Sequence, residues 1–137
     1  MRIKLLAAAL LFAASASFAE KKKMTIQEWK GANGGPAEAG NQVIGDAAAW
    51  TALWKTLGKD APIFNFKKSI AVAVFVGQKP TGGYSPVFEE PVAQGDDVLI
   101  RYRVPKPSGF VTQAFTQPWR IRAYPRPKGK VILGLVE

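Results

Sequence analysis

The adjacent carboxylates are the first candidates for chemistry in this sequence. Acidic residues stand side by side at Glu89-Glu90 and at Asp96-Asp97. A glycoside hydrolase needs two carboxylates that face each other across a cleft, whereas neighbours on a strand point to opposite faces. Asp96 and Asp97 lie in a predicted turn, and two adjacent aspartates fall short of the oxygen shell that calcium needs. We interpret both pairs as solvated surface.

The nucleophile systems of hydrolases are constrained by composition. The 137 residues contain no histidine and no cysteine, which excludes Ser-His and Cys-His pairs and removes the usual zinc ligands. The serines beyond the N-terminal segment are Ser69, Ser85 and Ser108, and none lies in a Gly-x-Ser-x-Gly elbow. A Ser-Lys pair stays open, without positive support. We expect no enzymatic activity, no metal site and no cofactor.

Basic residues offer a second kind of chemistry, the binding of anions. The net charge is +9 at pH 7, and four arginines alternate with apolar residues in two predicted strands: Arg101, Arg103, Arg120 and Arg122. If these strands are neighbours, the guanidinium groups share one exposed face. That face would bind acidic protein, phosphate or an anionic envelope surface. A solvated face whose charges oppose aggregation explains the same pattern. Nothing indicates a nucleic-acid-binding module.

A loop rich in backbone groups is the third candidate. The apolar run Ile70–Val76 predicts a strand buried on both faces, and Lys79–Tyr84 follows it as Lys-Pro-Thr-Gly-Gly-Tyr. Pro80 fixes φ, while Gly82 and Gly83 permit positive φ. A rigid scaffold presents a binding loop in this way. A hairpin connection without a partner has the same residues.

The elements that must position these residues are mostly short strands. One amphipathic helix is expected over Asp46–Gly58, where Trp50, Leu53, Trp54 and Leu57 form a single apolar stripe. About six strands separated by Pro/Gly turns are expected, including one over Phe110–Thr116. The Gly/Ala/Pro-rich segment 31–40 is predicted to be a flexible loop. The pattern predicts a mainly β fold, α+β by a looser definition: an antiparallel sandwich or barrel with one N-terminal helix.

The N-terminal segment has the composition of a secretory signal peptide. Arg2 and Lys4 precede the apolar run Leu5–Ala16, which is too short to span a bilayer as a helix, and Ser17-Phe18-Ala19 is a cleavage sequence. We therefore expect residues 1–19 to be removed after Ala19. Residues 20–137 would form a single exported domain, periplasmic or secreted.

Several motifs together resemble the PrcB C-terminal domain family, named for a subunit of a bacterial surface protease complex. They are the Trp-x-x-Leu-Trp helix, the Pro62/Phe64/Phe66 segment, the string Lys79–Ser85 and the segment Thr112–Trp119. The resemblance covers residues 25–136. It implies a small β-rich exported accessory domain without a catalytic role.

The loop Lys79–Tyr84 is also similar to a loop of chagasin-type cysteine-protease inhibitors, and Pro118-Trp119 is similar to a later loop of theirs. Those inhibitors are immunoglobulin-like sandwiches that insert such loops into a protease cleft. The resemblances imply an immunoglobulin-like sandwich that binds a protein, a secreted or envelope protease. The expected contact residues are Lys79, Pro80, Thr81, Gly82, Gly83, Tyr84 and Trp119.

Overall fold

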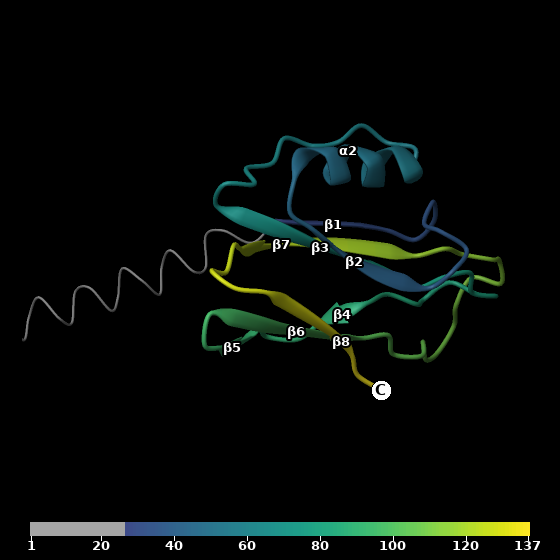
Figure 1. Ribbon diagram of the computed structural model, residues 1–137. Coiled ribbons are helices and arrows are strands. Elements are labelled where there is room, and N and C mark those ends of the chain that lie inside the picture. The colour runs from purple at the N-terminus through teal and green to yellow at the C-terminus, as the bar shows by residue number, and fades with distance from the viewer. Residues whose placement is uncertain (1–26) are drawn as a thin grey trace, which may run out of the picture.

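The computed structural model describes residues 27–137, so the expected signal peptide lies outside the described residues. Two sheets lie face to face, and one helix covers the outer face of the first sheet (Figure 1). The first sheet is antiparallel and has the order β1 (Glu28–Gly31), β7 (Trp119–Pro125), β3 (Ser69–Phe75), β2 (Gly40–Ile44). The second contains β4 (Val87–Phe88), β5 (Val92–Gln94), β6 (Asp97–Arg103) and β8 (Val131–Leu135). The predicted mainly β, sandwich-like fold is confirmed, and within residues 27–137 no barrel closes.

The final strand departs from the antiparallel expectation. β8 pairs with β6 in parallel, with Ile100 opposite Leu133. The turn before β8 would otherwise close a hairpin with β7. Both edges of β7 are occupied, by β1 on one side and β3 on the other. The chain therefore crosses from the first sheet to the second before it forms β8, and the second sheet is mixed.

The helix α2 (Ala47–Thr56) confirms the predicted amphipathic segment. The Asp46 carboxylate Oδ1 accepts a hydrogen bond from the Ala49 amide at 2.8 Å, which satisfies one of the free N–H groups at the helix start. Trp50, Leu53 and Trp54 are buried against the first sheet. The tryptophan stripe is therefore core, because the sheet covers it.

Strand β3 is buried on both faces, as its continuous apolar run predicts. Ala71 and Ala73 face the helix layer, where small side chains leave room for the tryptophans. Val72 and Val74 face the second sheet and pack with Ile100. β3 is thus the central scaffold from which the candidate loop emerges. None of the helices within residues 27–137 is long and apolar enough to cross a membrane.

Candidate partner-binding surface

The loop Lys79–Tyr84 leaves the end of β3 and is paired with a second, distant segment. The amide of Lys79 donates to the carbonyl of Thr116 at 2.8 Å, and the amide of Thr116 donates back to Lys79 at 2.9 Å. The segment 107–116 follows β6 and returns to the same end of the sandwich, at the right in Figure 1. We call residues 79–84 and 107–116 together the tip.

Further hydrogen bonds hold the two halves of the tip together. The Gly82 amide donates to the carbonyl of Thr112 at 2.9 Å. The hydroxyl of Thr116, a buried residue, donates to the carbonyl of Thr81 at 2.8 Å. These bonds pair backbone groups of one half of the tip with groups of the other half. The tip is therefore held in one arrangement by bonds between its halves.

Gly83 allows the two halves to approach closely. Its φ is +89°, and an added Cβ would lie 2.6 Å from the Pro107 Cβ and 2.9 Å from the Val111 Cγ1. Gly82 has no positive φ, and its Cβ would meet the Thr112 Cβ at 3.4 Å, an ordinary contact. Of the two glycines that permit positive φ, only Gly83 therefore adopts it. Between Gly82 and Gly83, it is Gly83 that combines a left-handed backbone with a close contact.

Two phenylalanines on the tip were not among the predicted contact residues. The relative exposure of Phe110 is 108% and that of Phe115 is 72%. The prediction of a strand over Phe110–Thr116 is wrong, since only Thr116 pairs, in its bridge with Lys79. A strand would have placed alternate side chains on a covered face. The sequence feature that could have indicated an exposed loop here is the pair of phenylalanines within a segment bounded by Pro107-Ser-Gly and Pro118.

The predicted contact residues of the first loop differ in how accessible they are. Pro80 and Gly83 are exposed, whereas Lys79, Thr81, Gly82 and Tyr84 are partly buried. The Lys79 Nζ lies 5.1 Å from the centre of the Tyr84 ring, a cation–π contact. Both side chains line a pocket beneath the tip. Tyr84 is therefore not a projecting anchor, and Phe110 and Phe115 are the tip's projecting aromatic groups.

Trp119 does not contribute to a contact surface, contrary to the sequence prediction. Its relative exposure is 3%, and its ring packs edge-on against Trp54 with ring centres 5.7 Å apart. The indole Nε1 donates to the carbonyl of Asn33 at 2.9 Å. A Cβ on Gly31 would lie 2.6 Å from that nitrogen, so glycine is what lets β1 lie over the ring. Trp119 faces the helix layer because it stands opposite Phe75 in the register of β3 and β7.

The four predicted arginines do not share one face, so that prediction is also wrong. β6 carries Arg101 and Arg103 on the outer face of the second sheet, opposite to the buried Ile100 and Tyr102. β7 belongs to the first sheet, and Arg120 and Arg122 stand opposite Val74 and Val72 on its inner face. Alternation of residue types with a period of two predicts which face of a strand each side chain lies on. It does not predict which sheet the strand joins.

Acidic partners also neutralise three of these arginines. Glu28 on β1 forms ion pairs with Arg120 and, at 3.8 Å, with Arg122. Arg101 pairs with Glu89 at 3.4 Å. The charges are thus dispersed and partly compensated, which removes the basis for a concentrated anion-binding face.

The titratable groups of residues 27–137 show one strong perturbation. Burial raises the pKa of Tyr124 to about 12, and the positive charge of Arg122 opposes that rise. Tyr124 packs with Val72 and Phe88 between the sheets. Within residues 27–137 no three acidic side chains gather closely enough to hold a metal ion. The tip therefore offers shape, apolar rings and backbone groups for recognition.

Comparison with known proteins gives one match. The family model described as PrcB C-terminal matches residues 70–122. No curated protein and no solved structure shows a significant match. The matched segment runs from β3 to the middle of β7 and includes both halves of the tip. The match over residues 70–122 supports the resemblance to the PrcB C-terminal family that the sequence motifs implied.

Proposed function

We propose that this protein is a non-catalytic accessory domain that binds a protease through the tip. The observation that carries the proposal is the pair of exposed rings, Phe110 and Phe115, on a segment tied by hydrogen bonds to the 79–84 loop. Aromatic side chains that project from an ordered backbone are typical anchors of protein interfaces. The family match supports a protease complex as the setting, since PrcB is named for a subunit of one.

The tip suits protein recognition because its cost of ordering is low. Exposed Phe110 and Phe115 leave a large apolar area in water, which a partner's pocket would cover. The backbone pairing of Lys79 with Thr116 fixes the loops before binding. Pro80 and Gly83 are exposed in the 79–84 loop, and glycine there would allow close approach of a partner's backbone.

The test is capture of a protease by the tagged domain from the envelope fraction of its own cells. Retained proteins are identified by mass spectrometry and assayed for peptide-bond cleavage. The double variant F110S/F115S should lose the captured protease. The matched control is Ile63→Ser, which removes an apolar side chain of 98% exposure in the connection between α2 and β3. Equal capture by F110S/F115S and wild type would contradict the proposal, as would a retained set without a protease.

We also propose that the domain is exported. The support is the basic start, the apolar run and the Ser17-Phe18-Ala19 cleavage sequence at residues 1–19. N-terminal sequencing of the protein from fractionated cells should give a chain that begins at Glu20 in the periplasmic or secreted fraction. A chain that retains residues 1–19 in the cytoplasmic fraction would contradict export.

A further inference from the structure

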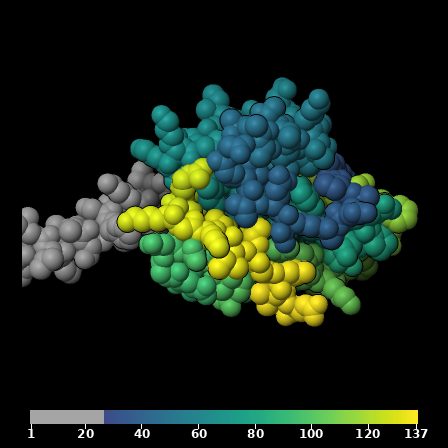
Figure 2. Space-filling view, in the orientation of Figure 1, coloured from purple at the N-terminus to yellow at the C-terminus, as the bar shows by residue number. Residues whose placement is uncertain are grey.

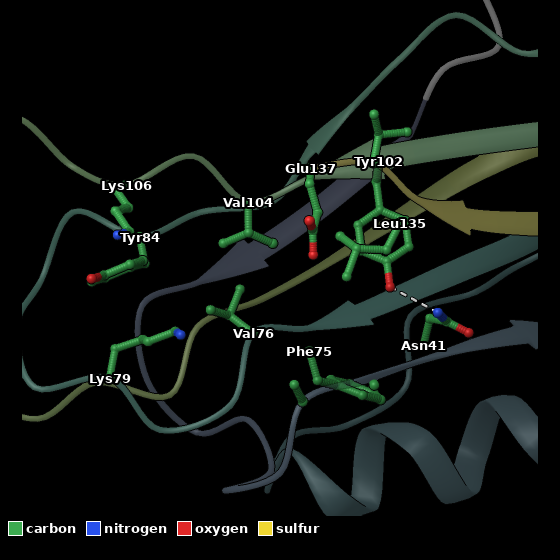
Figure 3. Close-up of a pocket in the computed structure, with 13 residues that line it drawn as sticks. Asn41, Phe75, Val76, Lys79, Tyr84, Tyr102, Val104, Lys106, Leu135 and Glu137 are labelled. Atoms are coloured by element: carbon green, nitrogen blue, oxygen red, sulfur yellow. Dashed lines mark hydrogen bonds between the residues drawn. The ribbon is translucent and has the colours of Figure 1, made fainter.

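A pocket of about 620 Å³ lies where the two sheets part beneath the tip. One wall comes from the start of β2 and the end of β3, and the other from β6 and the end of β8 (Figure 3). In the space-filling view β2 and β8 lie beside each other on the face toward the viewer (Figure 2). The volume falls in the range of pockets that hold small ligands or a few residues of a peptide.

The pocket has a cationic end. Lys79 and Lys106 line it on either side of Tyr84, and Figure 3 shows the Lys79 Nζ directed toward the pocket's middle. Neither lysine takes part in an ion pair within residues 27–137. Glu137 lines the pocket between Val104 and Leu135 (Figure 3) and pairs with neither lysine. Two ammonium groups without an ion-pair partner favour an anion at this end of the pocket.

The middle and the far end have different chemistry. The walls of the middle are apolar, formed by Phe75, Val76, Val104 and Leu135, and the Glu137 carboxylate is the one charged group beside them among the described lining residues. The far end holds Asn41, whose Nδ2 donates to the Tyr102 hydroxyl at 2.7 Å. This bond leaves the Asn41 side-chain carbonyl and the Tyr102 hydroxyl hydrogen available to a ligand. The sequence of groups is therefore cation, apolar wall and amide.

Unpaired strand edges flank the pocket. β2 pairs with β3 on one side, and β8 pairs with β6 on one side, so each presents its other edge to the opening. Such an edge can accept an extended peptide as an added strand. A fatty acid would make no use of these backbone groups or of the amide end.

We propose that this pocket binds the C-terminal residues of a peptide whose last side chain is apolar. Lys79 and Lys106 hold the terminal carboxylate, the apolar wall covers the last side chain, and Asn41 with the edge of β2 pairs with the preceding peptide groups. The inference goes beyond the proposed function: Lys79 and Tyr84 belong to both the tip and the pocket, but the projecting rings Phe110 and Phe115 do not line the pocket.

The test uses a fluorescein-labelled hexapeptide that ends in valine and leucine, in two forms, with a free carboxylate and with a C-terminal amide. Fluorescence anisotropy should show saturable binding of the free acid. Amidation should weaken it by roughly tenfold or more, since it removes a charge-assisted contact. Lys106→Met should weaken binding of the free acid by a similar factor, and Lys79→Met likewise. Lys128→Met, at an exposed lysine that does not line the pocket, is the matched control and should bind like wild type.

Three results would overturn the inference. They are equal affinity for acid and amide, no saturable binding up to about 1 mM peptide, and binding of decanoate, tested as a competitor, without binding of the peptide. Circular dichroism verifies that each variant is folded. Because F110S/F115S leaves the pocket intact, it should bind the peptide like wild type. Loss of protease capture and loss of peptide binding are therefore separable.

Discussion

The layer between helix and first sheet and the tip use the same kind of residue in opposite ways. Trp54 and Trp119 are each 3% exposed, whereas Phe110 is 108% and Phe115 is 72% exposed. The buried rings pack edge to face with one another. Burial of aromatic area stabilises the fold, while an exposed ring contributes nothing until a partner covers it. Aromatic content alone therefore does not distinguish core from contact surface.

The largest expected effect comes from the core side of this comparison. Trp54→Ala should lower the free energy of unfolding by about 3–5 kcal/mol, because it leaves a cavity between the helix and Trp119. Phe110→Ala should change it by no more than about 0.5 kcal/mol, since the side chain has no covered area to lose. Urea unfolding followed by tryptophan fluorescence and circular dichroism measures both. A loss of similar size for Phe110→Ala would remove the distinction between the regions.

The next largest effect tests whether the tip is held in one arrangement. Gly83→Ala should destabilise the protein by about 1–3 kcal/mol, because alanine resists φ near +89° and its Cβ would clash with Pro107. Gly82→Ala should cost less than about 0.5 kcal/mol, since it makes only an ordinary contact. Hydrogen exchange should quicken at the Gly82 and Thr116 amides in Gly83→Ala alone. Equal effects of the two alanines would show that the tip is not closely packed.

The third prediction concerns the ionisation of the Tyr124 hydroxyl, which is buried between the two sheets. The pKa of Tyr124 is raised to about 12 in the folded protein. The unfolded tyrosine ionises near pH 10, so above that pH the folded state retains a proton that the unfolded state has released. Stability should be full below about pH 10 and fall by up to about 2 kcal/mol toward pH 12. Urea unfolding across this range should show a shallower fall for Tyr124→Phe; an identical slope would contradict the assignment.

The smallest expected effect on stability belongs to the tip double variant. F110S/F115S should leave the free energy of unfolding within about 0.5 kcal/mol of wild type, because both rings already stand in water. Thermal and urea unfolding measure it. Capture of the protease should nevertheless be lost. A strongly destabilised double variant would mean that the rings support the fold rather than a partner.

The sequence predicted the elements whose signals are local and strong. The stripe of Trp50, Leu53 and Trp54 after Asp46 specifies an amphipathic helix, and the run Ile70–Val76 specifies a strand covered on both faces. These patterns depend on side-chain periodicity and a cap, which act within a few residues. The position of the 79–84 loop at the end of β3 follows from them.

Features that depend on distant pairing were not predictable in the same way. Trp119 follows a proline and resembles a loop residue, yet its register with Phe75 places it in the core. Arg101 and Arg120 have the same alternating neighbours, but their strands join different sheets. The segment 110–116, which contains Phe110 and Phe115, is rich in residues that favour strands. It nevertheless forms a loop, because only Thr116 pairs with another segment, in its bridge with Lys79. In each case a contact far along the chain decides the environment.

Site-specific photocrosslinking in the native cells tests the central claim most directly. A photoreactive phenylalanine analogue, benzoylphenylalanine, replaces Phe110 in one variant and exposed Ile63 in a matched one. On irradiation, the analogue at position 110 should yield a discrete crosslinked product with a protease, and the analogue at position 63 should not. A product of equal yield at both positions, or no protease crosslinked at position 110, would contradict a partner-binding tip.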